Sequence, residues 1–341
     1  MAVAVLASGM VTGVGLSAPA ACAAMRAGIS SFTETEFVFG GELLVGCPAP
    51  LESSWQGRER LIEMVARALD ECLSGISSAS PPEIPLLLCV AERERPGRLE
   101  GLDDSLLGDL EARLDRRFHP QSAVIANGRV AGVQAVERGR ALIAAARPHC
   151  IVAGVDTFLL SSTLEAYHAR RRLLTDGNLD GFIPGEGAAA ILLGLAHDRQ
   201  VESLCCLGLG YGREGATVES EEPLRADGLV GAFQGALQEA AIEWPQLDYR
   251  ITDLNGEQYG FKEAALALTR CLRVRKEEFD LWHPADCIGE VGAAIVPCAL
   301  GVALEAARKR YAPGPGVLCH FGNDTGERAA VVLRYGNGRR N

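Results

Sequence analysis

Residues Thr175–Leu193 read TDGNLDGFIPGEGAAAILL, and this stretch gives the strongest indication of the fold in the chain. Its glycines Gly181, Gly185 and Gly187 allow the backbone to turn tightly, because glycine adopts conformations that are closed to other residues. An apolar run of strand length, Ala188–Leu195, follows directly. Since this run has no alternating polar residues, it predicts a strand that is buried on both faces of a sheet.

On both sides of this stretch, apolar runs of strand length alternate with segments that have helical periodicity. This alternation predicts an α/β protein whose sheet is covered by helices on both faces. The predicted strands are Val3–Ala7 (followed by a glycine turn), Pro85–Val90, Ser122–Ala126, Cys150–Val155, Ala188–Leu195, Leu204–Tyr211, Tyr249–Leu254, Gly316–Phe321 and Ala329–Tyr335. The predicted helices are Ala18–Ala27, Gly57–Ser74, Asp104–Arg116, Val130–Ala146, Leu229–Ala241, Lys262–Thr269 and Ala293–Arg310.

The order of elements after about residue 198 resembles the order before it. We therefore expect two related halves, residues 1–197 and 198–341, that pack together as one compact unit. In such proteins a site commonly lies between the strand ends of the packed halves.

Composition excludes several classes of function. The net charge is -11, and the best candidate for a basic run, Arg170–Arg172, is most simply a solvated helix end, so no nucleic-acid partner is expected. The 11 cysteines are scattered without CxxC pairs, which is typical of free thiols in a reducing compartment and gives no metal site. No apolar window is long enough for a transmembrane helix. We expect a cytoplasmic protein without a cofactor.

Three stretches resemble the β-ketoacyl synthases, which have the thiolase fold. The segment DGFIPGEGAAAILL is similar to the family's DGFVxGEGAG motif and the strand that follows it. The opening VAVLASGMVTGVGLSAPAACAAMRAGIS and the closing VLCHFGNDTGERAAVVLRY match the family's first strand and its last hairpin, with Phe321 and Gly322 as the Phe-Gly pair. The resemblance implies a layered α-β-α-β-α structure in which Glu186 is a structural acid. The chain is shorter than most members, which implies trimmed loops.

The resemblance also shows where the catalytic residues of a ketosynthase would lie, and all three positions have changed. The nucleophile turn corresponds to VIANG, so Ile125 stands at the cysteine position (Ala126 with a one-residue shift), and no cysteine lies within twenty residues. Asn255 stands at the first histidine position and Glu290 at the last His or Asn position. Ile cannot form a thioester, and an ionised Glu would repel a developing oxyanion. Classical condensing activity is therefore not expected.

Other polar residues near these positions are weaker candidates. Asn127, His320 and Phe321 are predicted to line a remnant of the pocket, and His320 is most simply a structural histidine. Asn255 and Glu290 are expected to hydrogen-bond each other, which is the usual outcome for two buried polar groups. Asp324 is interpreted as a solvated residue of the final turn.

The first functional hypothesis is a catalytically inactive ketosynthase-like protein that acts by binding protein. Degenerate ketosynthases act as partner subunits, such as chain-length factors, and thiolase-like proteins also act as bacterial accessory proteins beside secretion spike and effector genes. The resemblance implies a ketosynthase, an acyl-carrier protein, or a secretion effector or spike component as partner. A homodimer or heterodimer is expected, because the strand beside the nucleophile turn can pair across a two-fold axis.

The second hypothesis is an atypical enzyme, a decarboxylase or hydrolase that acts on an acyl thioester. Glu290 would be its general base and Asn255 its oxyanion donor. A deep pocket lined by these two residues favours the enzyme, whereas a cavity plugged by Ile125 and its neighbours favours the adaptor.

Overall fold

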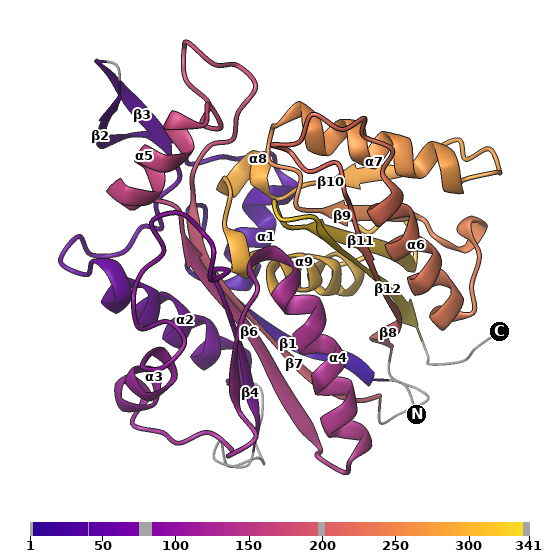
Figure 1. Ribbon diagram of the computed structural model, residues 1–341. Helices are drawn as coiled ribbons and strands as arrows, with labels where there is room; N and C mark the ends of the chain where they lie inside the picture. The colour runs from indigo at the N-terminus through magenta and orange to yellow at the C-terminus, as the bar shows by residue number, and fades with distance from the viewer. Residues whose placement is uncertain (1–2, 40, 75–83, 197–201, 337–341) are drawn as a thin grey trace.

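The computed structural model describes residues 3–39, 41–74, 84–196 and 202–336 (Figure 1). The predicted boundary between the halves, at residues 197 and 198, lies outside these ranges. The elements before the boundary are β1 (Val3–Thr12), α1 (Ala18–Arg26), β2 (Thr33–Phe39), β3 (Glu42–Gly46), α2 (Gly57–Leu73), β4 (Leu86–Val90), α3 (Leu106–Leu114), β5 (Ala123–Ala126), η2 (Gly128–Val130), α4 (Ala131–Ala144), β6 (His149–Thr157), α5 (Ser161–Ala169) and β7 (Glu186–Leu195).

The elements after the boundary also supply five strands of the large sheet, and they include no counterpart of the hairpin β2–β3 among the described residues. They are β8 (Ser203–Arg213), α6 (Asp227–Ala240), η3 (Trp244–Gln246), β9 (Tyr249–Thr252), α7 (Gln258–Cys271), β10 (Asp280–Trp282), α8 (Ala285–Ile288), η4 (Gly292–Ala294), α9 (Ile295–Arg308), β11 (Gly316–Gly322) and β12 (Glu327–Gly336).

Ten of the strands form one mixed sheet in the order β10-β9-β11-β12-β8-β1-β7-β6-β4-β5. Each group of five has the same internal order, in which the third strand lies at the edge and the first lies at the centre of the whole sheet. In each group the last strand, β7 or β12, runs antiparallel to its neighbours. The groups join where Val3–Val5 of β1 pairs antiparallel with residues 204–206 of β8. The two groups therefore repeat one topology.

Helices cover the sheet in layers (Figure 1). Helix α2 packs on β1, β6 and β7, and α6 packs on β8 and β12. Helices α4 and α9 contact each other and strands from both groups, so they lie between them. The arrangement is α-β-α-β-α, and the predicted layering is confirmed.

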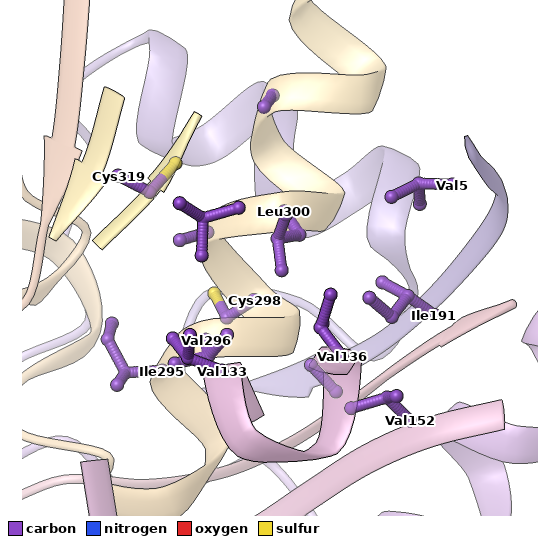
Figure 2. Packing of buried hydrophobic residues seen from close by; sticks show 14 of the residues in the cluster. Val5, Val133, Val136, Val152, Ile191, Ile295, Val296, Cys298, Leu300 and Cys319 are labelled. Atoms are coloured by element: carbon purple, nitrogen blue, oxygen red, sulfur yellow. The ribbon is translucent and has the colours of Figure 1, made fainter. Parts of the chain in front are cut away.

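The central layer contains the largest hydrophobic core. Helix α9 is apolar on all sides and has twelve of its fourteen residues buried, as expected for a helix enclosed by protein. Figure 2 shows Val296 of α9 beside Val133 of α4, with Ile191 of β7 and Cys319 of β11 on opposite sides of α9. This layer joins the two strand groups through one continuous apolar cluster.

Two features differ from the predicted elements. The first strand was expected to end at Ala7, but β1 continues through Gly9 to Thr12. Gly9 lies against α2, where a Cβ atom would come within 2.0 Å of the Ala68 carbonyl oxygen. The glycine therefore marks a close strand–helix approach and not a turn. The hairpin β2–β3 and helix α5 were not predicted, because few of their residues are buried.

The cysteines are free and lie mostly in the interior. All eleven cysteines are free, and all but Cys271 are buried. Within the described ranges, no helix is both long enough and apolar enough to cross a membrane.

We predict that Gly132 is required for the contact between α4 and α9. A Cβ atom there would lie 2.4 Å from the Cβ of Val296, so Gly132→Ala should lower the free energy of unfolding by about 1–3 kcal/mol. Gly108, inside α3, is the matched control because a Cβ atom there meets nothing within 4 Å. Gly108→Ala should raise the free energy of unfolding by roughly 0.5–1 kcal/mol through helix propensity. Urea unfolding would measure whether the free energy of unfolding falls for Gly132→Ala and rises for Gly108→Ala. Equal changes in the two variants would contradict the close contact at Gly132.

Candidate functional site

The turn after β5 is the one that the sequence analysis matched to the nucleophile turn of the family. Gly128 has a left-handed φ of 52°, and a Cβ atom there would meet the Glu92 carboxylate at 2.2 Å, so the turn requires glycine. Ile125 is half-buried and packs against the central core. Asn127 accepts hydrogen bonds from Asn323 Nδ2 at its carbonyl oxygen (3.0 Å) and at its Oδ1 (3.3 Å). The turn is present, but it offers no thiol or hydroxyl.

The residue that dominates this turn is Arg129, which the sequence did not single out. Its Nη1 donates to Glu290 Oε2 at 3.1 Å, and its Nη2 donates to Asp324 Oδ1. Its Nε lies 3.8 Å from Asp253 Oδ2. The Arg129 side chain is only 15% exposed, so its guanidinium and these carboxylates meet away from bulk water. One arginine of the first strand group thus engages three acids of the second.

Asn255 and Glu290, which the sequence analysis assigned to two of the family's catalytic positions, lie together. Asn255 Nδ2 donates to Glu290 Oε2 at 2.7 Å, as the sequence analysis expected for two buried polar groups. The other carboxylate oxygen, Oε1, accepts the Gly292 amide at 2.8 Å. With Arg129, three donors occupy the Glu290 carboxylate, which is 3% exposed as a residue. A fully engaged carboxylate is poorly placed to accept a proton from a substrate.

The glycine-rich stretch at residues 181–187 is hydrogen-bonded to the backbone of Glu290. The Gly185 amide donates to the Glu290 carbonyl at 3.0 Å, and the Glu290 amide donates to the Ile183 carbonyl at 2.8 Å. A Cβ atom at Gly185 would lie 2.3 Å from the Ile288 carbonyl oxygen, so only glycine permits this pairing. The stretch therefore positions Glu290.

Glu186 and the flanking glycines are built into the interior. The Glu186 carboxylate accepts hydrogen bonds from the Ala49 amide (2.9 Å), Arg60 Nε (2.8 Å) and Thr157 Oγ1 (3.1 Å). Cβ atoms at Gly181 and Gly187 would come within 2.4 and 2.9 Å of backbone atoms. These residues fix the backbone and present no free polar group to a ligand.

A second arginine extends the ionic contacts, and it corrects two interpretations. Arg172 was taken as part of a solvated helix end, but it is buried and its Nη2 donates to Glu257 Oε2 at 2.7 Å. Its Nη1 also donates to Asp324 Oδ2 at 3.1 Å. Asp324 is therefore not a simple solvated residue. Burial alone would raise the pKa of Asp324, but the guanidiniums of Arg129 and Arg172 hold that pKa well below its ordinary value.

A third arginine completes the group. Arg95 donates from Nη1 to Asp156 Oδ2 at 2.8 Å and from Nη2 to Glu92 Oε2 at 2.7 Å. Asp156 Oδ2 also accepts the Ala293 amide at 2.9 Å. Burial raises the pKa of Asp156 to about 6, although Arg95 opposes the shift. We call this set the arginine cluster: Arg95, Arg129 and Arg172 with Glu92, Asp156, Asp253, Glu257, Glu290 and Asp324.

The arginine cluster leaves little empty space. A cavity of only about 10 Å³ remains among its side chains, and a second of about 60 Å³ lies beside it, toward α6 and α7. Pockets that bind small molecules usually measure roughly 300–1,000 Å³. Ile125 lines neither of these cavities, so Arg129 and its partners fill the site and Ile125 does not. Within the described ranges, no set of three or more His, Cys, Asp or Glu is placed to hold a metal ion.

His320 and Phe321 both line the larger cavity, whereas Asn127 does not. His320 Nδ1 lies 3.2 Å from Thr252 Oγ1, and the imidazole packs edge-to-face against Phe233 of α6 at 5.2 Å. Burial, with a smaller effect from Arg250, lowers the pKa of His320 to about 3. His320 is therefore neutral near pH 7 and packs within the outer layer of the second strand group.

We predict that Arg129 stabilises the folded protein through this cluster. Arg129→Met should lower the free energy of unfolding by roughly 3–5 kcal/mol, because it leaves buried carboxylates without their counter-ion. Adding Glu290→Gln should recover part of that loss, since one of the uncompensated charges is then removed. Urea unfolding of the single and double variants would measure this coupling. Strictly additive losses would contradict a shared ionic contact.

We also predict an acid-dependent effect of His320. In the unfolded chain this imidazole takes up a proton below about pH 6.5, whereas in the folded protein it does so only near pH 3, so stability falls as the pH falls through that window. The contribution reaches about 1.4 kcal/mol per pH unit. His320→Asn should therefore flatten the dependence of the unfolding free energy on pH between 6 and 4. His119→Asn, on a partly exposed loop, is the control, and parallel curves for wild type and His320→Asn would contradict the prediction.

No protein-family model and no curated protein sequence matches this chain. Solved structures do match it over almost its whole length. The ishigamide ketosynthase/chain length factor superposes with a TM-score of 0.72 at 16% identity, covering 98% of this chain and 100% of that one. A β-ketoacyl synthase from Burkholderia phymatum gives 0.75 at 16% identity, with 98% and 99% covered.

Two further matches come from complexes. A type II polyketide ketosynthase in complex with its acyl-carrier protein gives a TM-score of 0.81 at 13% identity, covering 98% and 99% of the two chains. A ketosynthase with its chain length factor from Xenorhabdus doucetiae gives 0.70 at 14% identity, with 98% of each chain covered. The predicted thiolase-like architecture is confirmed, and this chain has the fold of the ketosynthases.

Proposed function

We propose that this chain works by binding protein, as an accessory or partner subunit, and does not condense acyl groups. The observation that carries the proposal is the arginine cluster. Arg129, four residues after Ile125, reaches the carboxylates of Glu290 and Asp324 and fills the space where an acyl thioester would react. A scaffold that keeps its fold and fills its reaction site is suited to recognition.

The chemistry of the site supports this reading. Condensation requires a nucleophile and donors that stabilise a developing oxyanion. Ile125 supplies no nucleophile, and the donors of Arg129 and Asn255 are already directed at Glu290. An incoming carbonyl oxygen would have to displace a carboxylate that accepts three hydrogen bonds.

The alternative, an acyl-thioester decarboxylase or hydrolase, has less support. Glu290 as a general base would need a free oxygen, but Gly292, Arg129 and Asn255 occupy both. The cavity among these side chains, at about 10 Å³, has room for about one water molecule and not for an acyl thioester. An enzyme of this kind would require the cluster to open.

The edge of the sheet supports a partner of the same fold. Strand β5 is the terminal strand of the ten-stranded sheet, where it pairs on one side with β4. Its residues Ala123–Ala126 are all apolar and half-buried, so the strand itself carries none of the charged side chains that usually protect an edge. Pairing with β5 of a second ketosynthase-fold chain would cover this edge. The solved neighbours include a ketosynthase in complex with its chain length factor.

We predict that the tagged protein, purified from its native cell, retains a stoichiometric protein partner. The partner should remain bound to Asn255→Ala with Glu290→Gln, because the surface is unchanged. Mass spectrometry of the retained material measures this, and thermal unfolding checks that the variant is folded. If the double variant does not fold, the single variant Asn255→Ser takes its place in the purification.

A co-purifying acyl thioester or acyl-carrier protein that is lost from the double variant would overturn the proposal. That result would show that the polar pair at Asn255 and Glu290 still contacts substrate, and it would establish the enzyme.

A further inference from the structure

Three aromatic residues, one before, one within and one after helix α5, form a small aromatic base at one side of the arginine cluster. Phe158, Tyr167 and Phe182 pack against one another with ring centroids 5.3–5.6 Å apart. All three are at least 95% buried, and Leu44 of β3 joins them. Two projections rest on this base, the hairpin β2–β3 and the turn at residues 175–180 (Figure 1).

The hairpin has one packed face and one open face. Phe37 and Phe39 turn inward, where they pack on the aromatic base, and Phe39 also stacks on His168 of α5 at 4.7 Å. On the open face, Val38 and Leu43 are cross-strand partners that are 57% and 48% exposed. Anchored aromatic residues on one face thus hold aliphatic residues in solvent on the other.

The turn presents a third aliphatic residue in the same way. Leu179 is 82% exposed, the most exposed large apolar side chain in the described ranges. The turn beneath it is firmly bonded. Asn178 Nδ2 donates to the carbonyls of Arg171 (2.8 Å) and Leu173 (2.9 Å), and the backbones of Thr175 and Asn178 exchange two hydrogen bonds of 3.0 Å. The turn thus holds the leucine in solvent on an ordered backbone.

Carboxylates surround these aliphatic residues. Glu34 and Glu36 are exposed on the hairpin, and Asp176 and Asp180 are exposed on either side of Leu179. The Asp180 carboxylate accepts the Gln258 amide at 2.7 Å, a contact that leaves its charge uncompensated. The neighbouring basic residues are Arg170, which pairs with Glu219 at 2.8 Å, and the exposed Arg171. The surface is therefore apolar at its tips and acidic around them.

We propose that the hairpin and the turn together form a docking surface, the two-pronged surface, for a protein segment that carries lysine or arginine beside aliphatic side chains. Its members are Glu34, Glu36, Val38, Leu43, Asp176, Leu179 and Asp180. The inference rests on the proposed protein-binding function and names the chemistry of the partner. An acidic partner would meet like charges at this surface, which costs affinity and slows association.

Site-specific photo-crosslinking in the native cell tests the surface. Benzoylphenylalanine replaces Leu43 or Leu179, one at a time, and the control position is Val274 after α7, which is 44% exposed. Both test positions should crosslink to the same protein, through a peptide with basic and aliphatic residues, and the control position should not. Glu34→Lys with Asp176→Lys should lower the crosslinking yield roughly tenfold, and Glu34→Gln with Asp176→Asn should lower it less.

The inference is overturned by the absence of adducts at both test positions, by equal yields at Val274, or by an acidic crosslinked peptide. If affinity purification retains a stoichiometric partner but positions 43 and 179 give no adduct, only the proposal of the two-pronged surface is wrong. If no partner is retained at all, the proposed protein-binding function is wrong as well.

Discussion

The Asp324 carboxylate accepts hydrogen bonds from Arg129 and Arg172 at once, and the site depends on this three-residue contact. The two arginines come from the first strand group, and the aspartate comes from the loop between β11 and β12 of the second. Each charge would be costly to bury alone, because removing an ion from water costs several kcal/mol unless a partner compensates it. The contact therefore determines which other charged groups must be present around it.

The remaining members of the cluster follow from that requirement. Arg129 has more donors than Asp324 can accept, so Glu290 and Asp253 complete its surroundings. Glu290 in turn has acceptor positions left, which Asn255 and the Gly292 amide fill. Arg172 is completed by Glu257 in the same manner. Most of the polar atoms of the network are hydrogen-bonded to one another, as buried polar groups generally are, and a substrate that reached Glu290 would have to break several of these bonds.

The fold could be predicted from sequence because its strongest signals are local. The glycines of the Gly181–Gly187 stretch and the apolar strand after it need no knowledge of distant residues, and the strands and helices of the layers show clear periodicity. The hairpin β2–β3 and α5 gave no such signal, since their open faces are polar or mixed. The role of Gly9 was predicted wrongly because glycine is required there by the close approach of α2, which lies about sixty residues away in sequence.

The site could be predicted only in part for the same reason. Ile125, Asn255 and Glu290 were singled out because the motifs around them resemble those of the family. Arg129 was not singled out, since it follows an ordinary turn glycine, and its partners Glu290 and Asp324 lie 161 and 195 residues away. Asp324 had no local feature that distinguished it from a solvated turn residue.

The arginine cluster and the two-pronged surface share the same aromatic rings, which connects the filled site to recognition. The Arg95 guanidinium lies 4.2 Å from the centroid of Phe158, and that of Arg172 lies 5.6 Å from Tyr167 and 5.9 Å from Phe182. Such contacts add roughly 0.5–2 kcal/mol each where water is excluded. The rings that support the hairpin and the turn are thus held from below by the arginines that fill the site. Only about 10 Å³ remains empty between the arginines and the rings. A partner that docks on the proposed two-pronged surface would meet a rigid base, because the rings beneath that surface and the arginine cluster support each other.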